Sequence, residues 1–200
     1  MTVLRKKKIP IHVLVMDRDR ELAAMLCDIL SKSGVCISQQ VGTIAEAQKT
    51  VDGCERVDVC ILEVYYDGVN EAAIGFIKSN ARKVSCVVFT QSESAGLGAR
   101  CCEAGAKKVV DKKNFDKEDF IRMVEYVASL HLINPGYTSH GTDTYDSATG
   151  ILLEKCPETV TAWAELTGIS DRQLRGLVKK NSKISARDAL YLAARLRKRI

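Results

Sequence analysis

Acidic residues stand at the ends of two expected strands, and Glu63 is the more informative of them. It follows the strand-forming run at 57–62, and Asp17 closes a similar run near the start of the chain. In an open α/β sheet, the carboxyl ends of the strands border the ligand crevice. Chemistry or regulation is therefore expected around Glu63, where Asp17, Arg18 and Lys112 should converge with it. Two acids and two cations at one place can neutralise one another without a metal ion.

The elements that position these residues follow from hydrophobic periodicity. Five runs rich in β-branched residues are predicted strands, at 12–16, 35–39, 58–62, 85–89 and 108–111. Helical patterns follow at 19–32, from Thr43 onward, and at 70–79, 94–103 and 116–130. Thr43 and Glu46 form a capping box. Strands joined by helical crossovers predict an α/β fold, a doubly wound, five-stranded, flavodoxin-like parallel sheet over residues 1–131.

This order of elements and strand-end residues resembles a response-regulator receiver domain. The resemblance implies two acids after strand one that hold Mg²⁺, an aspartate after strand three that accepts a phosphoryl group, and a Thr or Ser and a Lys that stabilise the product. Asp17, Thr90 and Lys112 match these positions. Arg18 stands at the second acid and Glu63 at the acceptor aspartate. The resemblance is thus to a receiver with altered chemistry.

Both substitutions weaken phosphoryl transfer on physical grounds. A guanidinium removes a hard oxygen ligand and repels Mg²⁺. A glutamate carries its carboxylate about 1.5 Å further out, the length of one C–C bond. We therefore expect no metal and no cofactor, and a pseudo-phosphorylation pocket in which Asp17, Arg18, Glu63 and Lys112 form a preformed ionic cluster beside Thr90, with Arg18 in the cation's place. Neutral decay of the pocket and surviving phosphorylation are the alternatives.

A dimer surface is expected on the same domain. Val109 stands where the family carries an aromatic residue that couples the pocket to the surface, which favours a standing dimer face over an inducible one. In the last predicted helix, Met123, Tyr126 and Leu130 widen the apolar stripe beyond what a core needs. Core packing and dimer contact both remain open for these three residues.

Positive charge is concentrated at the end of the chain. Residues 151–200 hold 11 Lys and Arg against 5 Asp and Glu, a net charge of +6, and residues 1–150 hold 19 against 20. Residues 132–150 are rich in turn formers and predict a linker. A basic domain at 151–200 favours a polyanionic partner, and a solvated basic face is the alternative.

The basic domain carries a helix-turn-helix pattern. Ala164 and Gly168 allow two helices to cross closely, and Ser170 with Gln173 forms a capping box for the second helix. The stretch from Ala164 to Leu196 resembles the lambda-repressor-like DNA-binding fold and the arabinose-type activator half-domain. The sequence does not distinguish between these two families. The resemblance implies base contacts by Arg172, Gln173 and Arg175, and phosphate contacts by Lys179, Lys180 and Lys183.

These features predict a cytoplasmic, DNA-binding transcription regulator. Its partners would be DNA with paired half-sites and a second copy of the chain, and a signalling protein is a further candidate partner. The alternatives are a phosphorylatable two-component response regulator and a protein-interaction adaptor without DNA binding. An enzyme is not expected, because the sequence shows no set of nucleophile, base and orienting group. No run of about 18 apolar residues predicts a membrane span, and no signal-peptide pattern is present.

Overall fold

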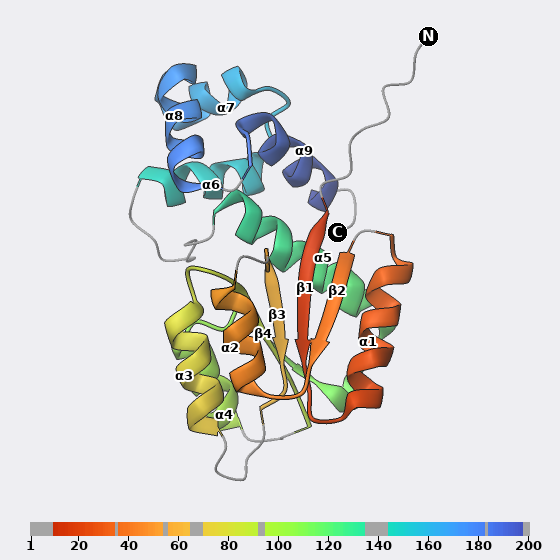
Figure 1. The fold of residues 1–200 in the computed structure, drawn as a ribbon. Coiled ribbons are helices and arrows are strands. Elements are labelled where there is room, and N and C mark those ends of the chain that lie inside the picture. Colours follow the sequence, from red (N-terminus) through yellow and green to blue (C-terminus); the bar gives the residue numbers. More distant parts are fainter. Residues whose placement is uncertain are drawn as a thin grey trace.

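The computed structural model describes residues 10–34, 36–53, 56–64, 70–91, 95–134, 144–182 and 184–197. Its first part contains a five-stranded parallel sheet in the order β2-β1-β3-β4-β5 (Figure 1). The strands are β1 (Ile11–Met16), β2 (Cys36–Val41), β3 (Val59–Leu62), β4 (Ser85–Thr90) and β5 (Lys108–Asp111). The strand order reverses between β1 and β3, and sheets of this type bind ligands outside the carboxyl ends of the strands at such a point.

Helices cover both faces of this sheet (Figure 1). The helices are α1 (Arg20–Lys32), α2 (Ile44–Asp52), α3 (Asn70–Asn80), α4 (Ala95–Glu103) and α5 (Lys117–Ile133). Helices α1 and α5 pack on one face, and α2, α3 and α4 pack on the other. Side chains alternate between the two cores along β1, since Val13 and Val15 join the first core and Leu14 and Met16 join the second. The predicted doubly wound α/β fold is confirmed.

Local signals fix the ends of the helices as predicted. The capping box of Thr43 and Glu46 is formed at the start of α2. Gly34, just beyond α1, has a positive φ of 67°, a conformation that favours glycine. The start of the second predicted strand, Val35, lies outside the described residues, as does Ser94 before α4.

In the described residues beyond 143, the chain forms four helices, which we call the bundle. They are α6 (Thr144–Lys155), α7 (Val160–Thr167), α8 (Asp171–Asn181) and α9 (Ala186–Arg197). Trp163 of α7 is fully buried at the centre, and its indole Nε1 donates a hydrogen bond of 2.8 Å to the carbonyl of Ala148 in α6. Leu152 and Leu174 complete this core.

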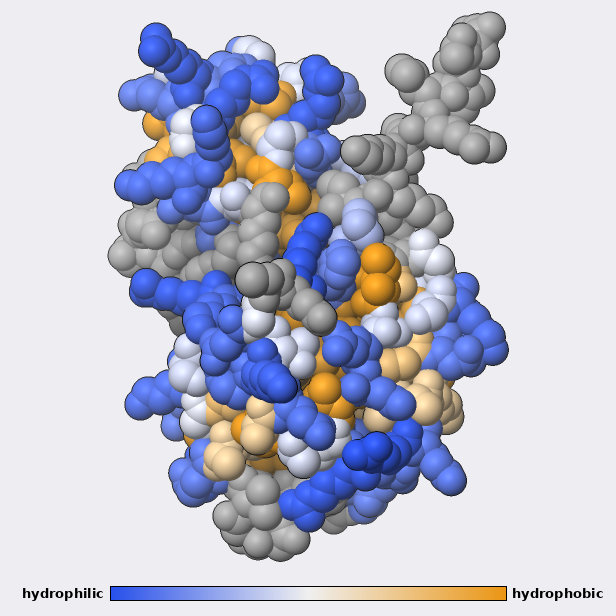
Figure 2. Space-filling view, in the orientation of Figure 1, coloured by the Kyte–Doolittle hydropathy of each residue, from blue (hydrophilic) through white to orange (hydrophobic). Residues whose placement is uncertain are grey.

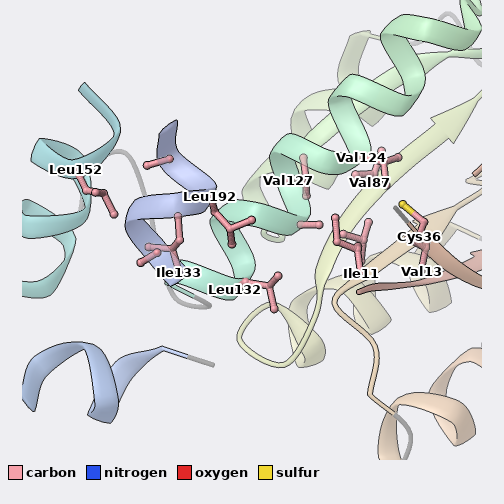
Figure 3. Close-up of a cluster of buried hydrophobic side chains, with 14 of the residues drawn as sticks. Ile11, Val13, Cys36, Val87, Val124, Val127, Leu132, Ile133, Leu152 and Leu192 are labelled. Atoms are coloured by element: carbon pink, nitrogen blue, oxygen red, sulfur yellow. The ribbon is translucent and has the colours of Figure 1, made fainter. Parts of the chain in front are cut away.

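Helix α5 belongs to the core of the sheet and to the core of the bundle. Its middle residues Val124 and Val127 pack with Ile11 at the sheet, and its last residues Leu132 and Ile133 pack among bundle side chains such as Leu152 and Leu192 (Figure 3). Both terminal side chains are fully buried. The hydroxyl of Ser182, after α8, donates a 3.0 Å hydrogen bond to the carbonyl of Leu132. One continuous apolar core therefore joins the sheet to the bundle.

This arrangement corrects the predicted linker at 132–150. Helix α5 continues to Ile133, and α6 begins at Thr144; residues 135–143 lie outside the described residues. The sequence around Thr149 and Gly150 is poor in helix formers, so no helical pattern was visible there. Burial of Ala148 and Leu152 against Trp163 outweighs the weak intrinsic preference.

Two further features concern the hydrophobicity of the helices and the state of the cysteines. Among the helices that the structure describes, none is long and apolar enough to cross a membrane. The described cysteines are free thiols, and most of them are buried. A buried free cysteine packs as a small hydrophobic side chain.

The shared core predicts that the two parts unfold together. Leu14→Ala removes a buried side chain on the sheet face away from α5 and should lower the free energy of unfolding by about 2–5 kcal/mol. Trp163 is the single tryptophan and reports on the bundle. Its fluorescence in a urea titration should move to lower denaturant by as much as the circular dichroism signal. Met25→Ala, at a residue that is 44% exposed, serves as the control. A Trp163 transition that stays at the wild-type midpoint in Leu14→Ala would show that the parts are independent.

Candidate functional site

Three of the sequence-predicted residues meet at the carboxyl edge of the sheet. Asp17 follows β1, Lys112 follows β5, and Glu63 follows β3, where its backbone N–H donates to the carbonyl of Met16 at 2.9 Å. Because parallel strands end at the same edge, residues 46 and 95 positions away from Asp17 reach it. We call Asp17, Glu63 and Lys112 the ionic cluster.

Lys112 is the cation at the centre of the ionic cluster. Its Nζ donates to Oδ2 of Asp17 at 2.7 Å and to Oε1 of Glu63. The side chains of Lys112, Asp17 and Glu63 are only 6%, 2% and 3% exposed. The Nζ also lies 5.6 Å from the centre of the Phe89 ring. A cation so well enclosed, with two acidic partners, holds both carboxylates in place.

The ionic cluster has more acid than base. The pKa of Glu63 is raised to about 7; burial is the main cause, and a hydrogen bond with Asp17 and the charge of Asp17 also raise it. The ammonium of Lys112 opposes this rise. Two carboxylates beside one lysine leave one negative charge in excess when both are ionised. Near neutral pH, a proton on Glu63 relieves that excess.

Further hydrogen bonds hold the residues around the ionic cluster in place. Oδ1 of Asp17 accepts the backbone N–H of Asp19 at 2.9 Å, and Asp19 in turn caps the start of α1. Thr90, the last residue of β4, is buried, and its hydroxyl donates a 2.6 Å hydrogen bond to the carbonyl of Val64. Thr90 thus ties β4 to the chain just after Glu63, and the same edge carries all four side chains.

Arg18 has a different place from the one expected. Its side chain is exposed, and it lines a cavity of about 230 Å³ that Glu63 also borders. The central position between the two carboxylates, which we expected Arg18 to share, is held by Lys112.

The residues at this edge do not fit Mg²⁺. Octahedral coordination needs several oxygen ligands, and Arg18 replaces one of them. Lys112 donates to both remaining carboxylates. In the part of the chain that the structure describes, no group of three or more His, Cys, Asp or Glu side chains could hold a metal ion.

A second candidate surface lies on α8. The helices α7 and α8 are joined by a three-residue turn, in which Gly168 adopts a left-handed φ of 69° and Ser170 caps α8. Leu174 and Val178 are buried on the inner side of α8. The charged side chains are exposed on the outer side, at Arg172, Arg175, Lys179 and Lys180.

Two of the predicted base-contacting residues also form hydrogen bonds within the protein. The Oε1 of Gln173 accepts hydrogen bonds from the backbone N–H and the hydroxyl of Ser170, at 3.0 and 2.8 Å, which completes the capping box. Arg175 donates through Nε and Nη2 to the carboxylate of Asp171. Asp171 also accepts from the hydroxyl of Thr161 at 3.2 Å. Asp171 and Arg175 lie four residues apart on one helix, and this spacing is the feature of the sequence from which the pair could have been predicted. Lys183 lies outside the described residues.

No protein-family model and no curated protein matches the sequence. The structure does match solved structures. A response regulator from Thermotoga maritima aligns with a TM-score of 0.53 at 17% identity, over 60% of this chain and 99% of that one. A CheY-like response regulator receiver domain protein from Methanospirillum hungatei aligns with a TM-score of 0.53 at 15% identity, over 60% and 94%. An orphan response regulator of H. pylori aligns with a TM-score of 0.52 at 12% identity, over 59% and 96%.

The α/β part has the fold of a response-regulator receiver domain. At these identities the likeness concerns the fold. We call β1 to α5 the receiver part, and its carboxyl edge holds the ionic cluster.

The raised pKa of Glu63 predicts a pH-dependent stability. A group whose pKa is higher in the folded than in the unfolded chain stabilises fully below its unfolded pKa, and this contribution is lost as the pH rises through the folded pKa. For Glu63 the window runs from the ordinary value of 4.5 to about 7. Glu63→Gln removes this titration. Relative to wild type, its free energy of unfolding should therefore increase between these pH values, by up to about 3 kcal/mol.

Urea titrations at several pH values, with Glu103→Gln at an exposed position as the control, measure this difference. A difference that stays constant or shrinks with rising pH would contradict the electrostatic account of the ionic cluster.

Proposed function

We propose that the chain is a DNA-binding transcription regulator that acts as a homodimer, and that its receiver part works without phosphorylation. The observation that carries the DNA-binding part is the geometry of α7, the three-residue turn and α8. In a helix-turn-helix, the second helix enters the major groove, and its amino-terminal residues meet the base edges. Arg172 and Arg175 stand at this place on α8.

Charge and position support the same proposal. Residues 151–200 carry a net charge of +6. Helices α7 and α8 lie at the end of the molecule away from the carboxyl edge of the sheet, and hydrophilic side chains gather there (Figures 1 and 2). Lys179 and Lys180 follow on the exposed side of α8, where they would meet phosphates. A single module of this size buries little interface, so we propose two copies on paired half-sites.

The ionic cluster supports independence from phosphorylation. Glu63 stands at the acceptor position and is bonded to Lys112, and the residues around it do not fit Mg²⁺. At a pH above its raised pKa, the carboxylate of Glu63 carries negative charge beside Lys112 without a phosphoryl group. In this proposal the receiver part holds one state and serves as a dimer platform for the bundle.

Base reading by α8 predicts a graded effect of substitutions. In selection from random duplexes, the wild-type chain should enrich one sequence. Arg172→Ala should then bind that sequence about tenfold or more weakly, because each good arginine–base contact contributes about 1–3 kcal/mol. Arg82→Ala, at an exposed arginine of the receiver part, is the matched control and should bind as wild type. Fluorescence anisotropy at rising salt completes the test, since affinity should fall steadily as salt increases. Binding that is absent or independent of salt would instead support a protein-interaction adaptor.

Phosphorylation is tested directly with a small donor. After incubation with acetyl phosphate and Mg²⁺, intact mass spectrometry of the full chain should show no added phosphoryl group, because Lys112 already bonds the acceptor carboxylate and the metal lacks ligands. A receiver that retains its acid pair and acceptor aspartate serves as the positive control. A stable adduct on Glu63, or on Asp67 outside the described residues, would identify the chain as a working phosphorelay output.

A further inference from the structure

The first residue of α8 joins two helices at the surface of the bundle. The carboxylate of Asp171 accepts hydrogen bonds from Nε and Nη2 of Arg175, one turn further along α8. Its Oδ2 also accepts a 3.2 Å hydrogen bond from the hydroxyl of Thr161, which lies in the first turn of α7. We call Asp171, Thr161 and Arg175 the α8 triad. Side chains from two helices therefore set the position of one carboxylate.

The carboxylate of the α8 triad is ionised near neutral pH. The hydrogen bond from Arg175 is the main cause that lowers the pKa of Asp171 below its ordinary value, and the charge of Arg175 and the hydroxyl of Thr161 lower it as well. An exposed pair of charges four residues apart contributes little to the stability of a helix. The bond from Thr161 adds a second direction to this pair, so the α8 triad is suited to orienting the guanidinium of Arg175.

The bonds to Asp171 leave one edge of the guanidinium available. An arginine carries five N–H donors in a planar fork. Asp171 occupies the edge formed by Nε and Nη2. Among the residues that the structure describes, Arg175 has no other hydrogen bond or ion pair, and its side chain is 55% exposed. The edge formed by Nη1 and Nη2 therefore presents two parallel N–H groups on the outer side of α8.

Two parallel donors select one base in the major groove. Guanine presents two neighbouring acceptors there, O6 and N7. Adenine presents one acceptor beside a donor, thymine presents one acceptor beside a methyl group, and cytosine presents a donor. Guanine alone accepts both hydrogen bonds. If Asp171 did not hold the other edge, the guanidinium of Arg175 could rotate toward a phosphate, which carries no sequence information.

We infer that Asp171 is a positioning residue for base recognition. Held by Thr161, it directs the Nη1–Nη2 edge of Arg175 into the major groove and thereby makes α8 select guanine at one position. This inference rests on the proposed DNA binding and adds the base that is read and the group that sets the contact. Arg172 differs from Arg175, because it has no hydrogen bond or ion pair with the described residues.

A set of duplexes tests the inference with the full chain. The duplex enriched in selection is varied through all four bases at each position, and affinities are measured by fluorescence anisotropy. Arg175→Ala identifies the position that Arg175 reads, because the preference for guanine should fall there by about tenfold or more. Asp171→Asn keeps the shape of the side chain but turns an amide donor toward the donors of Arg175. It should lower the same preference by about fivefold or more, because one base contact is lost.

A double mutant and a matched control separate positioning from charge. In the Arg175→Ala background, Asp171→Asn should leave the base preference within twofold, because Asp171 acts through Arg175. Glu165→Gln removes one negative charge from an exposed position of α7 and should leave the preference for guanine within twofold of wild type. Thr161→Val should lower this preference in the same direction as Asp171→Asn but by less, because Arg175 keeps both bonds to the carboxylate.

The outcomes distinguish this inference from the proposed function. Selective binding by the wild type with an unchanged guanine preference in Asp171→Asn would overturn the inference alone and assign Asp171 to helix stability, which a lowered thermal midpoint would report. A base other than guanine at the position that Arg175 reads, or no such position, would also overturn the inference alone. Absence of DNA binding by the wild type would overturn the proposed function and this inference with it.

Discussion

The burial of α5 in two places is the constraint on which the rest of the structure depends. This helix has 17 residues and a length of about 25 Å. Phe120 and Val124 pack on the sheet, and Leu132 and Ile133 pack inside the bundle. Each fully buried large apolar side chain contributes roughly 1.5–3 kcal/mol. Neither part can keep its core if the helix leaves it, so the position of the bundle on the receiver part is set by packing.

The same helix connects the two candidate sites. The strand arrows point away from the bundle, so the ionic cluster and α8 lie at opposite ends of the molecule (Figure 1). Near the cluster, the rings of Phe89, Phe115 and Phe120 pack together with centroid distances of 5.4–5.8 Å. Lys112 lies over Phe89, and Phe120 is in the first turn of α5. A change of charge at the cluster therefore has a packed route into α5, and through its last turn into the bundle.

Local and periodic features were predictable from the sequence. The capping boxes of Thr43 with Glu46 and of Ser170 with Gln173 need only a three-residue spacing. The convergence of Asp17, Glu63 and Lys112 follows from one rule, that parallel strands end at one edge. Features that tertiary packing decides were not predictable. Helix α6 begins with weak helix formers and packs against Trp163, so the sequence predicts a linker up to residue 150 where the structure has a helix from Thr144.

The contacts of single side chains were equally hidden. Lys112 lies between the two carboxylates, and residue types alone do not distinguish Lys112 from Arg18 for this place. The cavity beside Glu63 has walls from three loops and two helices, a combination with no sequence signature. Gln173 was expected at the bases, yet its carbonyl oxygen is used to cap α8.

The pairing of Arg175 with Asp171 changes the character of the outer side of α8. A lysine or arginine side chain that moves freely in solvent loses about 2 kcal/mol of rotamer entropy when a partner fixes it. Two hydrogen bonds to the carboxylate of Asp171 already orient the guanidinium of Arg175, so part of this entropy is lost before any partner binds. A surface that meets α8 therefore finds a planar group that Asp171 already orients, so less side-chain entropy remains to be lost at this position.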